Sequence, residues 1–494
     1  MTLADERLNE LDHPSLDPGE RARLRCLVAS DLIHRGQYEA AREALGDLWR
    51  GIGARPDVDS LDERAAAEVL LQAGTLSGWL GASEQVQGAQ ASAKDLISES
   101  AALFESFGLT ERAAVARCKL ALCYWREGAY DEARILLGQS FDELDDADAE
   151  RRAIVLLRWV TVECAAGRLH NALSILKESY QILSGSENHT LRGSFHNLHA
   201  VTLRQLGAVE GHGDYYDRAI IEYTAAIYHY ERARHERYAA IIENNLAFLL
   251  YKLGRYEDAH EHLDRSGVTL SRLGDAGLLT EVEETRALVL VAEKQYREAE
   301  RVIAGAIRTL EQGDEAARLA DALTVQGVVW ARLGNYEASI NAMRRAVSLA
   351  EESGALSNAG LAALALIEEH GTRRAISAEE LHNLYRRADR LLKDTQTAEE
   401  IVRLRACARV VLRRLTGVQL REKNFTLFGA VHELEAKFIV QALEESGGSV
   451  TRAAKLLGIR HQTLTSMLET RHKGLSKKRT PAKKRLRSII KKGC

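Results

Sequence analysis

Apolar residues recur at spacings of three and four along most of the chain, a pattern typical of amphipathic helices. In residues 239–254 these positions are Ile242, Leu246, Leu249, Leu250 and Leu253. Gly254 ends this predicted helix, because glycine takes the left-handed backbone angles of a helix C-terminus without strain. The 494 residues include only 4 prolines, and helix formers outnumber strand formers. The sequence therefore predicts an all-α protein.

The predicted helices come in pairs that repeat along the chain. A turn built around a tyrosine, with a small residue three positions later, occurs at Tyr256 and recurs every 40 residues at Tyr296 and Tyr336. Earlier copies of this turn lie at residues 36–41, 128–133, 167–172 and 214–219. Because one hairpin cannot bury its apolar face alone, repeated hairpins predict a stacked solenoid.

This repeat resembles the tetratricopeptide family. The resemblance rests on small residues at the first-helix crossing (Ala200, Ala247, Ala287) and on the turn that follows each of them. It implies a tetratricopeptide-type α-solenoid of about eight to nine helical hairpins over residues 20–395, after an N-terminal segment of residues 1–19. It also implies that the first helix of each hairpin lines a concave groove.

The same resemblance supplies a candidate ligand site in that groove. In the family, the residue ten positions before the turn faces the concavity, as do residues one or two turns later. Carried over residue by residue, these positions are Asn197, Arg204, Asn244, Tyr251, Lys252, Glu284, Thr324 and Arg332. A carboxamide can donate to and accept from a peptide backbone, so the resemblance implies that a peptide or protein binds here. The alternative is that these are solvated polar side chains.

Residues 434–475 carry a different helical pattern, with short helices and tight glycine turns. A first helix ends at Gly447-Gly448, and Ser449 is expected to cap the second helix. Gly458 then makes a sharp turn into a third helix from Arg460 to Leu468. The residues expected on the apolar faces are Leu434, Phe438, Ile439, Ala442, Leu443, Ala453, Ala454, Leu464, Met467 and Leu468.

Spacing and residue type over residues 425–475 resemble the Fis-type helix-turn-helix of bacterial activators. The resemblance implies that the third helix enters the major groove of DNA, with Arg460 and Gln462 at bases or phosphates. The candidate DNA-binding residues are Thr451, Arg452, Arg460, His461, Gln462, Thr463, Thr465, Ser466, Arg471 and Lys473. Each could instead be a solvated surface residue. Family members usually carry more arginine where this chain has His461 and Gln462, which leaves the sequence preference open.

The net charge of −4 hides an uneven distribution. From Arg421 onward there are 17 Lys or Arg and 6 Asp or Glu, whereas the rest of the chain has 50 and 65. An acidic body with a basic end predicts a polyanionic partner, which could be DNA, RNA or a membrane surface. Beside a helix-turn-helix, the basic tail of residues 476–494 favours double-stranded DNA and disfavours a membrane.

The sequence contains no pattern typical of an enzyme. It has no phosphate-binding glycine loop, kinase motif set, Gly-x-Ser-x-Gly elbow or His-Glu-x-x-His helix. The histidine pairs at 196/199 and 260/262 lack convergent partners, so neither a metal nor a cofactor is expected. Scattered cysteines, a polar N-terminus and the lack of a long apolar run favour a cytoplasmic protein with reduced thiols.

Together these patterns predict a nucleoid-associated DNA-binding transcriptional regulator whose solenoid binds a peptide or protein effector. A helical linker over residues 396–424 would join the effector-binding solenoid to the DNA-binding helix-turn-helix. A homodimer would form through the helices before the turn, extended by Phe425, Leu427, Phe428 and Val431. The alternative is a non-enzymatic assembly scaffold whose basic tail tethers it to RNA or a membrane.

Overall fold

The structure is a computed structural model of the chain. It describes residues 16–34, 36–83, 86, 88–145, 148–312, 316–373, 375–393, 395, 397–416 and 427–478. All regular elements in these residues are helices, which confirms the predicted all-α class. The chain divides into two compact units, Met1–Ala408 and Arg409–Cys494, and each is described by itself. Most of the predicted N-terminal segment and of the basic tail, and residues 417–424 of the predicted linker, lie outside the described residues.

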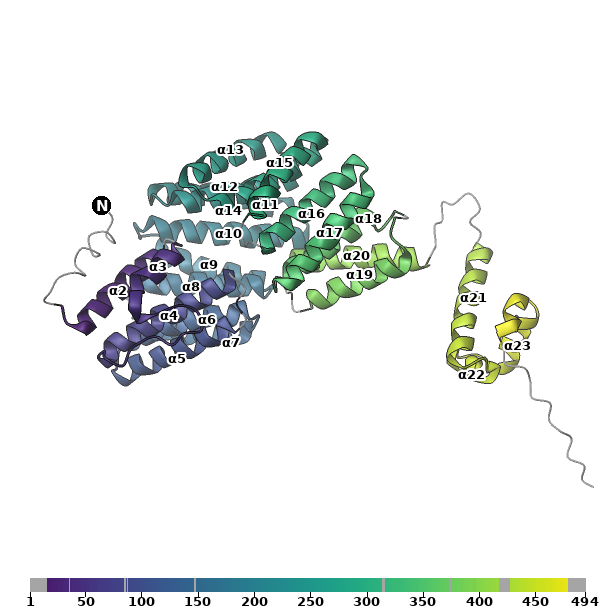
Figure 1. The fold of residues 1–494 in the computed structure, drawn as a ribbon, viewed down its shortest axis with the longest axis horizontal. Helices are drawn as coiled ribbons and strands as arrows, with labels where there is room; N and C mark the ends of the chain where they lie inside the picture. Colours follow the sequence, from purple (N-terminus) through teal and green to yellow (C-terminus); the bar gives the residue numbers. More distant parts are fainter. Residues whose placement is uncertain are drawn as a thin grey trace, which may run out of the picture. The chain divides into compact units, whose positions relative to one another are not determined.

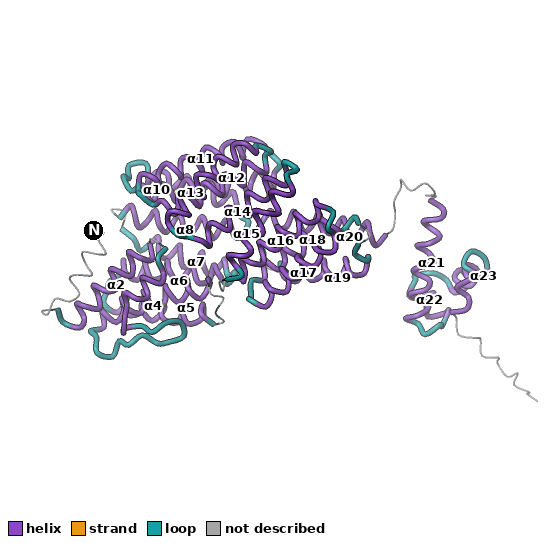
Figure 2. Tube along the Cα trace, turned by 45° about the horizontal axis from the view of Figure 1, so that its top comes forward, coloured by secondary structure: helices purple, strands orange, loops and turns teal. Residues whose placement is uncertain are grey.

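The first unit is a succession of antiparallel helix pairs (Figure 1). Figure 2 shows that short loops join most of these helices. In chain order the elements are α2 (Pro18–His34), α3 (Tyr38–Leu45), η1 (Gly46–Leu48), α4 (Glu63–Ser83), α5 (Ala89–Ser106), α6 (Thr110–Arg126), α7 (Tyr130–Asp142), α8 (Ala149–Ala165), α9 (Leu169–Leu183), α10 (His189–Glu210), α11 (Gly213–Arg232), α12 (Glu236–Lys252), α13 (Tyr256–Leu273), α14 (Ala276–Ala292), α15 (Tyr296–Leu310), α16 (Ala316–Leu333), α17 (Tyr336–Glu352), α18 (Leu356–His370), α19 (Ala378–Leu391) and α20 (Ala398–Thr416).

The turns within the hairpins require a left-handed residue. Gly254 has φ +76°, and beyond it the Arg255 amide donates to the carbonyl of Leu250 at 2.9 Å, which closes the end of α12. Lys294 occupies the equivalent position after α14 with φ +65°, and Gln295 donates to Leu290 in the same way. The backbone thus keeps this turn even where the sequence lacks glycine.

Small side chains let the helices of each hairpin approach closely. Ala247 and Ala259 are fully buried at the crossing of α12 and α13. At the crossing of α16 and α17, a Cβ atom on Gly327 would lie only 2.5 Å from Met343 Cγ. The Ser339 hydroxyl, in the position that Ala259 holds two 40-residue repeats earlier, donates to the Gly327 carbonyl at 2.6 Å. This packing explains the small residues of the sequence repeat.

The second unit contains α21 (Leu427–Glu445), α22 (Val450–Leu456), α23 (His461–Glu469) and the short η2 (Lys473–Lys478), together with the last residues of α20. Gly447 and Gly448 turn the chain between α21 and α22, and Gly458 does so before α23, all with positive φ. The helices share a small core of Ile439, Ala442, Leu443, Ala453, Ala454, Leu464 and Leu468. Over the described residues no helix is long and apolar enough to cross a bilayer.

Candidate nucleic-acid interface and repeat groove

Helix α23 packs through one face and leaves the other accessible within its unit. Leu464 and Leu468 are buried against α21 and α22, and Met467 is half-buried beside them. Arg460 is the N-cap residue, with extended backbone angles, and the helix begins at His461. The third helix therefore starts one residue later than expected, and Arg460 lies at the positive end of its dipole.

Most of the predicted DNA-contacting side chains lie on the surface. Those exposed are Thr451, Arg452, Arg460, His461, Gln462, Thr463, Ser466, Arg471 and Lys473. Thr465 differs, because it is half-buried and its hydroxyl donates to the His461 carbonyl at 2.9 Å. Arg471 is exposed but pairs with Glu435 at 3.3 Å. The exposed candidates at and within the first turns of α23 are thus Arg460, His461, Gln462, Thr463 and Ser466.

Of two local expectations for this unit, the N-cap position of Ser449 is confirmed, whereas the burial of Leu434 and Phe438 is wrong. Ser449 is the N-cap residue of α22, but its side chain makes no capping hydrogen bond. Ser446 bridges the turn instead, with its hydroxyl 3.2 Å from the carbonyls of Leu443 and Ser449. Leu434 and Phe438, expected on the buried face of α21, are 46% and 53% exposed.

These two side chains belong to an apolar stripe on α21. Val431, also 46% exposed, lies three residues before Leu434, and Phe438 follows four residues after it. Such spacing places all three on one side of a helix. Ile439, Ala442 and Leu443 fill the adjacent core-facing side. Helix α21 therefore has more apolar surface than its own unit covers.

The described residues contain one group that could hold a metal ion, formed by His432, Glu435 and His472. The two imidazole rings are stacked, with centroids 4.3 Å apart and planes 13° apart. Because ring-nitrogen lone pairs lie in the ring plane, parallel stacked rings do not aim them at a common point. Glu435 also accepts hydrogen bonds from Arg471 and His472. The geometry fits a hydrogen-bonded cluster better than a metal site.

The histidine pairs of the solenoid are also tied to carboxylates. His196 and His199 both contact Glu222, at 2.6 and 3.1 Å, while His260 contacts Glu293 at 2.9 Å. His262 bonds to the buried Glu243. Each imidazole thus has an acidic partner within the fold.

The groove residues of successive first helices share an unusual feature. Asn197 on α10, Asn244 on α12 and Glu284 on α14 each have a buried side-chain oxygen with no hydrogen-bond partner in the described part of the chain. Buried polar groups in proteins are normally paired. Thr324, the next position on α16, donates its hydroxyl to the Ala320 carbonyl instead. Unpaired acceptors at the same repeat position are what a ligand that donates hydrogen bonds would satisfy.

Glu284 lies in an acidic part of this surface. Burial raises the pKa of Glu284 well above its ordinary value, and the nearby Asp321 and Glu281 add to that effect. Burial likewise raises the pKa of Asp321 to about 6, although Asn358 donates to its carboxylate at 2.7 Å. Arg318 contacts Glu281 at 3.3 Å. Repulsion between these acids favours a protonated carboxyl or a cationic ligand at this site.

The remaining groove candidates are tied to α18 and α20. Arg204 on α10 donates to both carboxylate oxygens of Glu399 on α20, at 2.7 and 2.8 Å. Lys252 lies near Glu399 as well, and burial lowers its pKa. Arg332 pairs with Glu369 at 2.7 Å, and burial raises the pKa of the neighbouring Tyr251. These four residues therefore already lie against carboxylates of α18 and α20, which a groove ligand would have to displace or share.

Helix α20 makes further contacts with α18. Arg403 donates to Glu368 at 2.9 Å, and the Cys407 thiol faces the Leu364 carbonyl at 3.7 Å. The helix that was expected to be a linker therefore begins as part of the first unit. Sequence reasoning missed this because the Arg204–Glu399 pair spans 195 residues.

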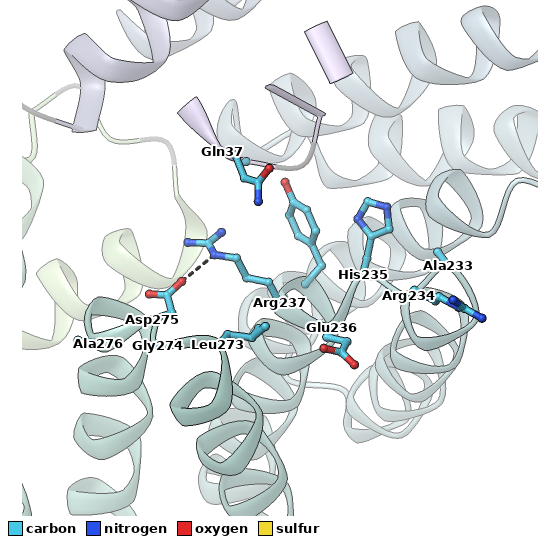
Figure 3. A pocket seen from close by; sticks show the side chains of 12 residues that line it. Gln37, Ala233, Arg234, His235, Glu236, Arg237, Leu273, Gly274, Asp275 and Ala276 are labelled. Carbon is cyan, nitrogen blue, oxygen red and sulfur yellow. Dashed lines mark hydrogen bonds and ion pairs between the residues drawn. The ribbon is translucent and has the colours of Figure 1, made fainter. Parts of the chain in front are cut away.

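A cavity of about 780 Å³ opens where the turn at Gly36-Gln37 faces the turns before α12 and α14 (Figure 3). Arg237 and Asp275 form an ion pair of 2.7 Å on its wall. A Cβ atom on Gly36 would lie 3.5 Å from the Tyr238 hydroxyl. The stacking of hairpins thus places the turn between α2 and α3 beside the start of α12. No local sequence pattern predicts this contact between distant hairpins.

Two protein families match parts of the chain. The family described as bacterial regulatory protein, Fis family, matches residues 430–468. The tetratricopeptide repeat matches residues 320–353. The chain therefore carries a tetratricopeptide repeat and a C-terminal Fis-family helix-turn-helix, as the sequence resemblance predicted. Both are binding modules rather than catalytic domains. None of the curated proteins matches the chain.

Solved structures with a similar arrangement of helices are distant. The apo quorum sensor NprR from B. thuringiensis is 14% identical, with 70% of this chain and 97% of that chain covered and a TM-score of 0.48. A Rap protein complexed with competence and sporulation factor is 15% identical, with 74% and 99% covered and a TM-score of 0.46. Yeast Tom70 is 12% identical, with 84% and 86% covered and a TM-score of 0.43. At these values the likenesses support no functional conclusion.

Proposed function

We propose that this chain is a DNA-binding transcriptional regulator. The observation that carries the proposal is the exposed face of α23, which presents Arg460, His461, Gln462 and Ser466 from a helix anchored by Leu464 and Leu468. In a helix-turn-helix, the first turns of this helix lie in the major groove and the preceding helix lies at phosphates. The exposed Thr451 and Arg452 on α22 suit the latter role.

The solenoid is proposed to bind a peptide or protein effector along its first helices. The unpaired acceptors of Asn197, Asn244 and Glu284 would take hydrogen bonds from a peptide backbone or from a basic side chain. An effector that reaches Arg204 would compete with Glu399 and loosen the start of α20. Since α20 leads toward the helix-turn-helix, this competition would couple effector binding to the presentation of α23.

The regulator is further proposed to act as a homodimer at the nucleoid in the cytoplasm. Two-fold DNA sites need two reading helices, and the stripe of Val431, Leu434 and Phe438 offers α21 of a second copy an apolar contact. The side chains of Phe425, Leu427 and Phe428, which were expected to extend this surface, lie outside the described residues.

Selection of bound fragments from random duplex DNA tests the proposal. The full chain is expected to enrich a defined motif, and the Gln462→Ala variant is expected to relax the preference at one position of that motif. Gln441→Ala is the matched control, because Gln441 is exposed on α21 and donates to Glu445. Enrichment of no motif by the full chain would refute the regulator and leave the scaffold alternative.

A further inference from the structure

Three cationic side chains meet between the first helices of the N-terminal hairpins without an acidic partner. They are Lys119 and Arg126 on α6 and Arg158 on α8. Arg126 stacks over Trp79 at 4.2 Å from the ring centroid, and its Nη2 atom is buried with no hydrogen-bond partner. No hydrogen bond or ion pair joins the side chain of Lys119 or of Arg158 to another described residue. All three side chains are half-buried, and like charges that are partly withdrawn from water repel one another when no counter-charge is present.

The three cations line a cavity of about 160 Å³. Its other walls are mostly apolar or aromatic, with Ile33, Trp79 and Leu122 among them, and Thr75 adds a hydroxyl. Lys119 and Arg158 also line an adjoining cavity of about 230 Å³, whose wall adds Arg112 and Arg151. Of the described residues that line either cavity, none carries a carboxylate. The described side chains that line the two cavities are therefore either cationic or uncharged.

Arg112 and Arg151 have carboxylate partners, whereas the side chains of the three cluster cations do not. Arg112 bonds to Glu68, and Arg151 pairs with Glu111 at 2.7 Å and with Asp148 at 2.6 Å. These carboxylates do not line the cavities. Burial lowers the pKa of Lys119 to about 7, and Arg158 and Arg112 add to the effect, with Cys118 and Glu68 opposing it weakly. The site would gain from a negative charge placed among Lys119, Arg126 and Arg158.

A neutral polar group also faces the larger cavity. Gln72 on α4 is only 3% exposed and lines this cavity, and its side-chain oxygen has no hydrogen-bond partner. A carboxamide can present either its oxygen or its amino group to a ligand. An unpaired carboxamide this deeply buried is independent evidence that the cavity is built to hold a polar molecule.

We propose that these adjoining cavities bind a small anionic ligand whose phosphate or carboxylate group lies among Lys119, Arg126 and Arg158. Guanidinium groups match the planar edge of either anion. The volumes suit a short organic anion rather than a helix or an extended chain. The apolar wall of Ile33, Ile97 and Leu122 would contact the uncharged part of the ligand. Tyr238 on α12 also lines the smaller cavity, but the groove residues Asn197, Asn244 and Glu284 line neither cavity, and the site does not depend on DNA binding.

Calorimetric titration of the full chain with sodium sulfate and with sodium benzoate at constant ionic strength tests the proposal. Sulfate stands for a phosphate group and benzoate for a carboxylate with an apolar body. Saturable binding of at least one probe is expected. Binding of sulfate alone identifies a phosphate-type ligand, and binding of benzoate alone identifies an organic acid. The proposal is overturned if neither probe binds saturably.

The double variant Lys119→Met/Arg158→Met removes two charges and keeps the apolar stems. It is expected to weaken binding about tenfold or more, since each charge-assisted hydrogen bond contributes strongly. It is also expected to melt at a higher temperature than the unliganded wild type, because it relieves repulsion within the cluster. Arg297→Met is the control, as the Arg297 side chain on α15 is 90% exposed.

A merely structural role for Lys119 and Arg158 predicts the opposite pattern. The double variant would then melt at a lower temperature, and the probes would bind wild type and variant with equal affinity. If the double variant does not fold, Lys119→Met alone replaces it, because it removes one of the like charges. Equal binding by that variant and the wild type would equally overturn the site.

Discussion

At the scale of single residues, the solenoid keeps carboxyl groups whose burial outweighs the effect of a nearby cation, as it outweighs that of Arg318 at Asp321. Asp321 is the clearest, because burial raises its pKa from 3.8 to about 6 while Asn358 supplies only a neutral donor. A carboxyl whose pKa rises on folding stabilises the fold most when it is protonated. Its contribution is full below about pH 3.8 and is lost as the pH rises through about 6.

The Asp321→Asn variant should therefore be more stable than the wild type by roughly 3 kcal/mol at pH 7.5, and by only about 1 kcal/mol at pH 4.5. The amide keeps an oxygen for the Asn358 donor and cannot ionise. Urea unfolding at the two pH values measures the difference. Asp217→Asn, at an exposed position on α11, should show no such dependence. A variant less stable than the wild type at pH 7.5 would contradict this reading.

At the scale of elements, hairpin turns set where each helix ends. Gly254 holds φ +76°, where an added Cβ is strained, and Lys294 accepts φ +65° in spite of its side chain. The same backbone closure follows both residues. The turn is therefore imposed by the packing of the two helices, and the residue at its centre decides only how much strain it carries.

Replacing the turn residues should change stability in opposite directions. Gly254→Ala is expected to destabilise the solenoid by about 1 kcal/mol, and Lys294→Gly to stabilise it by about 0.5–1 kcal/mol. Gly305→Ala serves as control, because Gly305 lies inside α15 and a Cβ there would make only an ordinary contact of 3.9 Å with Arg308 Nη2, so alanine should stabilise. Chemical denaturation measures all three. Loss of stability in Lys294→Gly would show that strain is absent there.

The elements were largely predictable, because periodicity and glycine position are local properties of the sequence. The turn at Gly254 and the core residues Leu464 and Leu468 follow directly from them. The exposure of side chains on α21 was not predictable. The helical period places Leu434 and Phe438 on an apolar face, but it does not say which part of the protein covers that face. The pairs Arg204–Glu399 and Arg403–Glu368 were also beyond reach, because they depend on how distant hairpins stack.

At the scale of the whole molecule, helix α20 is proposed to couple the groove of the first helices to α23 of the helix-turn-helix. The link begins at the Arg204–Glu399 pair, whose partners are 20% and 36% exposed. A partly exposed ion pair of this kind contributes about 1 kcal/mol or less. That is weak enough for an effector to displace, and strong enough to change how often the start of α20 opens.

Breaking this pair should loosen α20 selectively. Glu399→Gln is expected to speed amide hydrogen exchange in residues 398–408 by up to about fivefold, with other helices unaffected. Glu99→Gln is the matched control, because Glu99 forms an exposed pair with Arg55 at 2.6 Å. Unchanged exchange in α20 would mean that the pair does not restrain the helix, and the proposed coupling would then lack its first step.

The central claim is that α23 reads duplex DNA. The direct test is the dissociation constant of the full chain for its selected duplex, measured by fluorescence anisotropy at fixed salt. The Arg460→Ala/Gln462→Ala double variant should bind at least about tenfold more weakly, because each base contact contributes about 1–3 kcal/mol. The Arg297→Ala variant should bind like the wild type, because the Arg297 side chain on α15 is exposed to solvent. Equal affinity of the double variant and the wild type would contradict the account.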